Sequence, residues 1–187
     1  MRRLALVTAA VTMALATPAF AALKEGAKAP EFTTNGALAG KPFHLNLDTQ
    51  LKKGPVVLYF FPAAFTSGCN AEAKAFAAAM PKFRAEGATV IGMSADSVAQ
   101  LTKFSTTHCN SKFPVATASP AVIKEYDVSL GRTIKTPEGV ERAITDRTSY
   151  VIAPDGTILY SYTAMSPVDH VANTLAAVRK WKASHHS

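Results

Sequence analysis

The stretch YFFPAAFTSGCNAEAKAF (residues 59–76) joins an apolar run to an alanine-rich segment and places a cysteine, Cys69, at the junction. The run that leads into it, PVVLYFF (residues 55–61), is continuous, as expected of a central strand covered on both faces. Residues 69–84 carry large apolar side chains at helical spacing and predict a helix with a kink at Pro81. Cys69 is therefore expected in the first turn of a helix that follows a buried strand.

Strand and helix patterns alternate along the rest of the chain, in an order that ends with two strands and a closing helix. This order predicts an α/β fold in which a central mixed β-sheet is flanked by helices. Strands are expected at residues 43–47, 89–95, 113–117 and on both sides of a turn at 154–156, and helices at 97–109, at 121–128 and from 166 to the end.

The sequence contains capping residues that predict where two of these helices begin. Asp96 is expected to cap the helix at residues 97–109, and residues 166–169 (SPVD) have the spacing of a capping box for the last helix. The last helix should then bury one face. That face is expected to carry Val168, Val171, Leu175 and Val178.

The first 21 residues have the features of a secretory signal peptide. Arg2 and Arg3 precede an apolar run at residues 4–16, and Ala-Phe-Ala at 19–21 fits the small-x-small cleavage rule. The run is shorter than the roughly 20 residues that a spanning helix needs, so a retained membrane anchor is the weaker interpretation. We expect cleavage after Ala21, a periplasmic or secreted product, and no membrane attachment after cleavage.

The remaining residues, 22–187, suit a single domain. The formal net charge of +7 falls when the two leader arginines are removed, and the other Lys and Arg residues are scattered, so nucleic acid is not an expected partner. Two cysteines are too few for a disulfide scaffold. The closing His185 and His186 lack other ligands at useful spacing and predict a solvated tail rather than a metal site.

The expected position of Cys69 and the residues before it favour a reactive cysteine. Unpaired N–H groups and the helix dipole at a helix start favour thiolate over thiol, and hence a nucleophile. Pro62, Thr66 and Cys69 have the spacing P-x-x-x-T-x-x-C, which places a hydroxyl about one helical turn from the sulfur. A buried, unreactive cysteine remains the alternative from position alone.

These residues carry a family resemblance. FFPAAFTSGCNAE resembles the active-site signature of the peroxiredoxins, and DRTSYVIAPDGTILYSY resembles the later segment that holds the family's active-site arginine. From EGAKAPEFT to the final helix, the chain is similar to the peroxiredoxin Q or bacterioferritin comigratory protein subfamily. The resemblance implies a thioredoxin-like fold with Cys69 as the peroxidatic cysteine, Thr66 and Pro62 as pocket residues, Arg147 as the cation beside the thiolate, and Glu72 orienting that arginine.

The sequence departs from the family pattern at three places. Lys74 stands where many relatives have a second cysteine, so a resolving thiol has to come from elsewhere. Ser67 replaces a common proline, which leaves the loop less rigid. Residues 128–145 match no pattern that predicts a structure or a role.

The implied function is reduction of hydrogen peroxide and organic hydroperoxides by Cys69, without a metal or organic cofactor. Cys109, the other thiol, is expected to resolve the sulfenic acid as an intramolecular disulfide. A thioredoxin-like or other periplasmic dithiol protein would then reduce that disulfide. The protein itself is expected to be a monomer or weak homodimer.

A non-catalytic thioredoxin-fold binding module with a structural Cys69–Cys109 disulfide remains the alternative. Thiol-disulfide exchange through C-x-x-C is not expected, because position 72 is Glu72, and copper delivery through C-x-x-x-C is not expected, because position 73 is Ala73.

Overall fold

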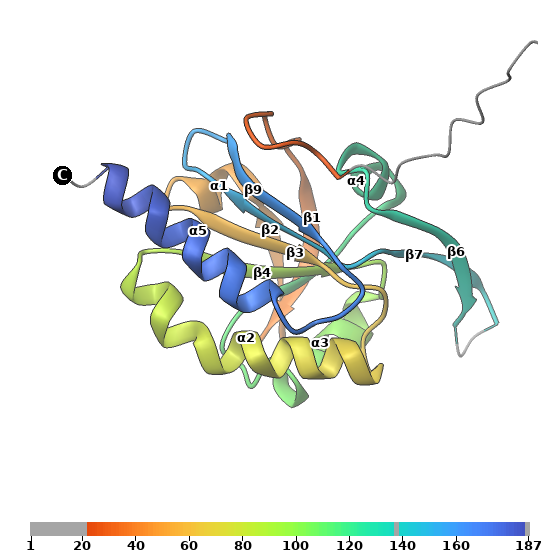
Figure 1. The fold of residues 1–187 in the computed structure, drawn as a ribbon. Helices are drawn as coiled ribbons and strands as arrows, with labels where there is room; N and C mark the ends of the chain where they lie inside the picture. The colour runs from red at the N-terminus through yellow and green to blue at the C-terminus, as the bar shows by residue number, and fades with distance from the viewer. Residues whose placement is uncertain (1–21, 137–138, 186–187) are drawn as a thin grey trace, which may run out of the picture.

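A seven-stranded mixed sheet forms the centre of the computed structural model, which describes residues 22–136 and 139–185 (Figure 1). The predicted leader and His186 lie outside these residues. The strand order is β2-β1-β5-β4-β3-β8-β9, with β3, β4 and β5 parallel and the other neighbouring pairs antiparallel. The strands are β1 Thr33–Leu38, β2 Lys41–Asn46, β3 Val56–Phe60, β4 Thr89–Ser94, β5 Val115–Thr117, β8 Thr148–Ile152 and β9 Ile158–Thr163.

The central strand β3 divides the interior into two apolar clusters. Successive side chains of a strand point to opposite faces, so Val57 and Tyr59 enter one cluster, while Leu58 and Phe60 enter the other. All four side chains are fully buried. Coverage of both faces explains why the sequence of this strand is continuously apolar, as predicted.

Helices close both faces of the sheet. Helices α2, α3 and α5 contribute to the cluster that contains Tyr59, and α1 and α4 contribute to the opposite cluster. Figure 1 shows α2 and α5 side by side along one face. The mixed sheet and its flanking helices confirm the predicted α/β arrangement. The helices are α1 Leu47–Leu51, α2 Ser67–Ala85, α3 Val98–Thr107, α4 Pro120–Glu125 and α5 His170–His185.

The uninterpreted segment at residues 128–145 forms a separate antiparallel arm. Its strands are β6 Ser129–Lys135 and β7 Glu141–Thr145, and Figure 1 shows them projecting from the body of the molecule. Most side chains of β6 are exposed, which explains why its sequence has no strong apolar pattern.

Three expectations about helix ends are wrong. Asp96 does not cap α3; Ser97 does, through a capping box with Gln100, because the buried Asp96 carboxylate is bound elsewhere. Helix α3 ends at Thr107, so Cys109 follows it instead of closing it. Helix α5 begins at His170, since the carbonyl of Asp169 accepts the Asn173 N–H as the first helical bond.

The late start of α5 also corrects its predicted buried face. Val168 lies before the helix and is 75% exposed, whereas Leu175 and Val178 are buried as expected. Helix α2 is continuous through Pro81. Strand β1 was not predicted from the sequence.

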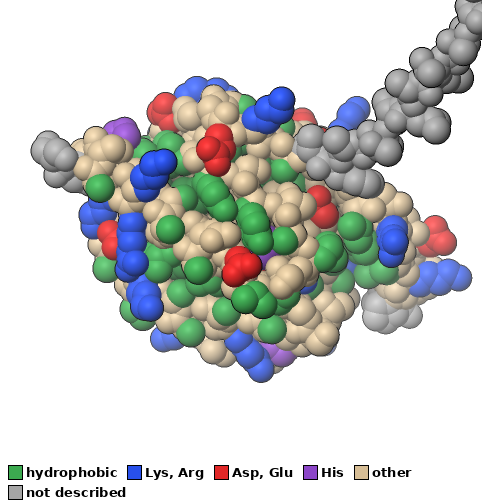
Figure 2. All heavy atoms as spheres, viewed as in Figure 1, with side chains coloured by type: hydrophobic (Ala, Val, Ile, Leu, Met, Phe, Trp, Pro, Cys, Tyr) green, Lys and Arg blue, Asp and Glu red, His purple; other side chains and the backbone are tan. Residues whose placement is uncertain are grey.

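Charged side chains on the face shown in Figure 2 are spread among other kinds of side chain. On the face shown in Figure 2, Lys and Arg side chains lie singly or in short rows among neutral and apolar ones. No helix within the described residues is long and apolar enough to cross a membrane.

Candidate active site

Cys69 lies in the first turn of α2, the helix that follows the central strand β3 after a short loop. Thr66 is the N-cap residue, so Cys69 is the third residue of the helix. The side chain is buried, with 2% of its surface exposed. The sulfur therefore lies near backbone N–H groups that have no partner within the helix, as the sequence predicted.

Arg147 meets this sulfur from the start of β8. Its Nη2 atom lies 3.6 Å from Cys69 Sγ, and its Nε donates to the carbonyl oxygen of Met165 at 3.0 Å. Its Nη1 forms an ion pair with Glu72. The guanidinium thus contacts the sulfur and is held there by its bonds to Met165 and Glu72. A planar guanidinium can do this because its several N–H donors point in different directions.

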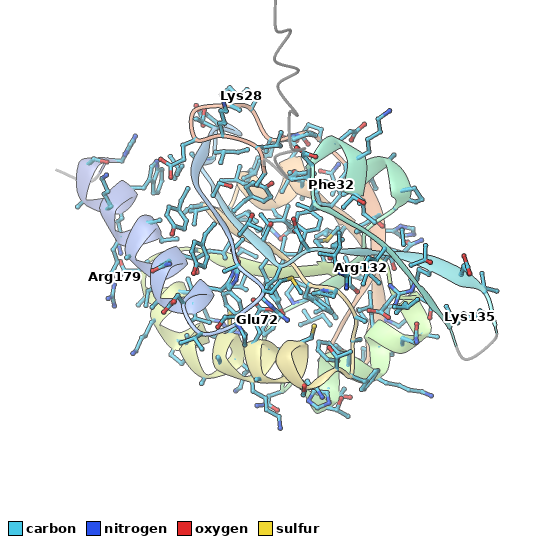
Figure 3. All side chains as sticks on the ribbon, turned by 45° about the vertical axis from the view of Figure 1, so that its right-hand side comes forward. Lys28, Phe32, Glu72, Arg132, Lys135 and Arg179 are labelled. Atoms are coloured by element: carbon cyan, nitrogen blue, oxygen red, sulfur yellow. The ribbon has the colours of Figure 1, made fainter. Side chains whose placement is uncertain are left out.

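Glu72 lies one helical turn after Cys69 and points into the space between α2 and the sheet (Figure 3). Its side chain is fully buried. Burial raises the pKa of Glu72 to about 7, and the charge and hydrogen bond of Arg147 oppose this rise. Arg147 carries its positive charge beside Cys69 whatever the state of Glu72, and above about pH 7 the Glu72 carboxylate helps to hold it there. The structure brings Cys69, Glu72 and Arg147 together, and their catalytic roles stay predictions.

Thr66 and Pro62 lie on the loop that joins β3 to α2. Thr66 is exposed and its hydroxyl donates to the carbonyl oxygen of Ala63 at 2.9 Å, which leaves its oxygen lone pairs open. Pro62 is half-buried. Phe65, on the same loop, has φ +69°, a strained backbone conformation for a residue other than glycine, and its side chain is 44% exposed.

Asp96 holds this loop, a role that its sequence position did not suggest. Its Oδ2 accepts from the Ala64 N–H and from the Ser94 hydroxyl, each at 2.7 Å. Its Oδ1 accepts from Arg142 Nη2 at 2.8 Å. Arg142 comes from β7, so the arm is joined to the loop before Cys69 by an ion pair whose carboxylate is buried.

Gly68 provides the space that Arg147 occupies. A Cβ atom at position 68 would lie 3.1 Å from Arg147 Nη2, which is closer than ordinary contact allows. The glycine directly before the cysteine was the available sequence signal for this role.

Cys109 is fully buried behind the end of α3. Burial raises the pKa of the Cys109 thiol, which disfavours its reactive thiolate form. The nearby rings of Phe65, Phe104 and His108 contact one another and connect the active-site loop to the end of α3. Both cysteines are free thiols in this structure.

Metal-ligating residues do not gather at this site. Within residues 22–136 and 139–185, no group of three His, Cys, Asp or Glu side chains could hold a metal ion. A hollow between β9 and α5, lined by Tyr160, Asn173 and Trp181, contains none of the residues around Cys69.

Comparison with known proteins identifies relatives along most of the chain. The AhpC/TSA family profile matches residues 26–161. The chain is 30% identical over 167 residues to "Peroxiredoxin Q, chloroplastic" of Sedum lineare, covering 87% of this chain and 82% of that protein. It is 32% identical over 157 residues to the protein of the same name from Oryza sativa subsp. japonica, covering 82% of this chain. The match spans 65% of the length of the rice relative.

A solved structure shares the fold. Peroxidoxin BcpB from Mycobacterium tuberculosis superimposes with a TM-score of 0.72 at 28% identity, covering 84% of this chain and 97% of that one. These matches confirm the resemblance to the peroxiredoxin Q and bacterioferritin comigratory protein subfamily, and with it the thioredoxin-like fold.

Proposed function

This chain belongs to the AhpC/TSA family, and from that membership we propose that it is a peroxiredoxin, a thiol-dependent peroxidase that reduces hydroperoxides at Cys69. The observation that carries the proposal is the 3.6 Å approach of Arg147 Nη2 to the Cys69 sulfur. A buried guanidinium at this distance stabilises a thiolate and the negative charge that leaves it during reaction.

In the first step, the Cys69 thiolate attacks the terminal oxygen of the hydroperoxide. An S–O bond forms as the O–O bond breaks, and the departing oxygen takes up a proton and leaves as water or an alcohol. Cys69 is oxidised to the sulfenic acid. Arg147 and the Cys69 backbone N–H act as fixed donors toward the two oxygens, so little solvent reorganisation is needed. Because the Thr66 hydroxyl hydrogen is bonded to the Ala63 carbonyl, its oxygen is available to accept the O–H of the hydroperoxide.

In the second step, the Cys109 thiol condenses with the sulfenic acid. A disulfide forms and water leaves, and a thioredoxin-like or other periplasmic dithiol protein returns two electrons. Both thiols are buried in one apolar cluster, and we propose that the first turn of α2, the end of α3, or both open as the sulfurs join. The Arg147 guanidinium beside the Cys69 sulfur favours this cycle over a non-catalytic module stapled by a permanent disulfide.

Two exposed apolar side chains support organic hydroperoxides as substrates beside hydrogen peroxide. Phe65 is 44% exposed next to Thr66, and Met165, whose own carbonyl oxygen accepts from Arg147, is 52% exposed. Their surfaces offer contact to an alkyl chain. If this is correct, Phe65→Ser should raise KM for an alkyl hydroperoxide more than for hydrogen peroxide; equal changes would exclude this contact.

The leader sequence supports export to an oxidising compartment, in the periplasm or outside the cell. Mass spectrometry of the protein from a cell fraction tests this: an N-terminus at Ala22 in the periplasmic fraction supports export, and an intact leader in the cytosol excludes it.

Sedimentation at several concentrations tests the expected monomer or weak homodimer, which a constant larger mass would contradict.

The activity itself is tested by peroxide consumption in the presence of excess small-molecule dithiol. The wild-type protein should consume hydrogen peroxide catalytically, and Cys69→Ser should not. Cys109→Ser is the matched control, because it removes the other thiol and leaves Cys69 and Arg147 in place. Absence of turnover in the wild-type protein, or wild-type turnover in Cys69→Ser, would exclude the proposal.

A further inference from the structure

His170 is a buried histidine behind the active-site ion pair. It begins α5, and its side chain is fully buried. Its Nε2 lies 2.9 Å from the carbonyl oxygen of Ala164, and its Nδ1 lies 2.8 Å from the hydroxyl of Ser149. The ring also packs edge-on against Tyr162. Both nitrogens of the imidazole are therefore engaged.

The partners determine where the ring carries its hydrogen. A carbonyl oxygen only accepts, so Nε2 must donate to Ala164. Burial lowers the pKa of His170 and keeps the ring neutral, so Nδ1 accepts from the Ser149 hydroxyl. The other charged or titratable groups near the ring are Glu72 on α2, Arg147 before β8 and the adjacent Asp169.

The Nε2 bond fixes the backbone that holds Arg147. Ala164, whose carbonyl accepts from His170, donates its own N–H to the carbonyl of Arg147 at 3.1 Å. The next carbonyl, that of Met165, accepts from Arg147 Nε at 3.0 Å. His170 thus binds one side of a two-residue segment whose other contacts clamp the arginine.

The neutral Nδ1 has a second consequence, for Glu72. Glu72 Oε1 is buried, lies 3.8 Å from His170 Nδ1, and has no hydrogen-bond partner among the described residues. Because Nδ1 carries no hydrogen in this tautomer, it does not draw the carboxylate away from Arg147. The Glu72 carboxylate stays on the guanidinium through Oε2.

We propose that His170 is a positioning residue for the peroxidase reaction, which holds Arg147 against the Cys69 sulfur through the Ala164–Met165 backbone. The inference rests on the proposed function. The ring nitrogens of His170 bond Ser149 and Ala164 rather than the sulfur, so we expect its effect on the reaction to pass through Arg147.

A double-mutant cycle with Arg147→Ala tests this, read as the second-order rate constant for hydrogen peroxide. His170→Asn is too short to donate to Ala164 and should slow the wild-type protein on the order of tenfold. In the Arg147→Ala protein the same substitution should have no further effect. His170→Gln can reach Ala164 with its amide N–H and should recover most of the rate.

Two further variants make the outcome decisive. Ser149→Ala removes the donor to Nδ1 with little change in volume, so it should also slow the wild-type protein and leave Arg147→Ala unchanged; it decides the matter if His170→Asn does not fold. Leu175→Ala, on the same helix, should lower the melting temperature without slowing the reaction. Equal slowing with and without Arg147, or no slowing at all, would overturn the inference. A wild-type protein that consumes no peroxide would instead reject the proposed function.

Discussion

Arg147 Nη2 lies 3.6 Å from the sulfur of Cys69, a residue 78 positions earlier in the chain. The two residues meet because β3 and β8 are paired neighbours, so the end of one strand lies beside the start of the other. The sequence separation explains why the contact cannot be inferred from local pattern. Its consequence is a fixed positive charge at the atom proposed to react.

Replacing Arg147 should therefore slow the reaction strongly. We expect Arg147→Ala to reduce the rate of sulfenic acid formation by on the order of 10²-fold, the effect of losing one preorganised donor. Arg147→Lys should restore little, since one ammonium cannot bond Glu72, Met165 and the sulfur together. Stopped-flow peroxide decay measures both. A rate within threefold of the wild type for Arg147→Ala would exclude the role.

Glu72 should give the reaction a dependence on pH. Its pKa is raised to about 7, so it becomes protonated as the pH falls through this value and its attraction for Arg147 weakens. The peroxide rate of the wild-type protein should fall below about pH 7. Glu72→Gln should be slow at pH 8 and should lack this part of the pH profile. An identical profile for both proteins would contradict the assignment.

The raised pKa of Glu72 also determines how the free energy of unfolding changes with pH. Between the ordinary pKa of a glutamate and about 7, the folded protein holds a proton at Glu72 that the unfolded chain has released. The free energy of unfolding should therefore decrease as the pH rises through this window. Urea denaturation of the wild type and Glu72→Gln at several pH values isolates the contribution.

The ion pair between Arg142 and Asp96 should stabilise both the fold and the loop before Cys69. Arg142→Met leaves the Asp96 carboxylate buried without its cation and should lower the free energy of unfolding by about 2–3 kcal/mol. The double variant with Asp96→Asn should lose less than the two single effects added. Arg132→Met, on the exposed strand of the same arm, is the control and should change little. Additive losses would show that the two residues are not coupled.

Cys109 should require local opening to react. In Cys109→Ser, we expect sulfenic acid to accumulate at Cys69 after one equivalent of peroxide, because the resolving thiol is gone. In the oxidised wild-type protein, amide hydrogens in the first turn of α2 and near the end of α3 should exchange faster than in the reduced protein. Uniform protection with a clearly higher melting temperature on oxidation would favour a structural disulfide.

The sequence predicted the features that depend on short-range pattern. The apolar run of β3, the turn at residues 154–156 and the position of Cys69 in the first turn of α2 all follow from neighbours in the chain. Glu72 and Arg147 were named through the family resemblance, and the structure adds their buried ion pair.

The features that the sequence did not predict depend on distant partners. Asp96 has the local appearance of a helix cap, but its carboxylate bonds Ala64 and Arg142, 32 and 46 residues away. Likewise α5 begins at His170, after the apparent capping box at residues 166–169, and the buried ring of His170 bonds Ser149, 21 residues away. Burial of a polar side chain becomes visible only once the elements are packed.

The central claim, that Cys69 reduces hydroperoxides with Cys109 as its resolving partner, is tested most directly by a single turnover. The reduced protein is mixed with one equivalent of hydrogen peroxide without any donor, and peroxide, free thiols and intact mass are then measured. We predict that the peroxide disappears, that both thiols of each chain are lost, and that non-reducing peptide mapping finds Cys69 joined to Cys109, while Cys69→Ser consumes nothing. Peroxide that persists with both thiols still free in the wild-type protein would contradict the account.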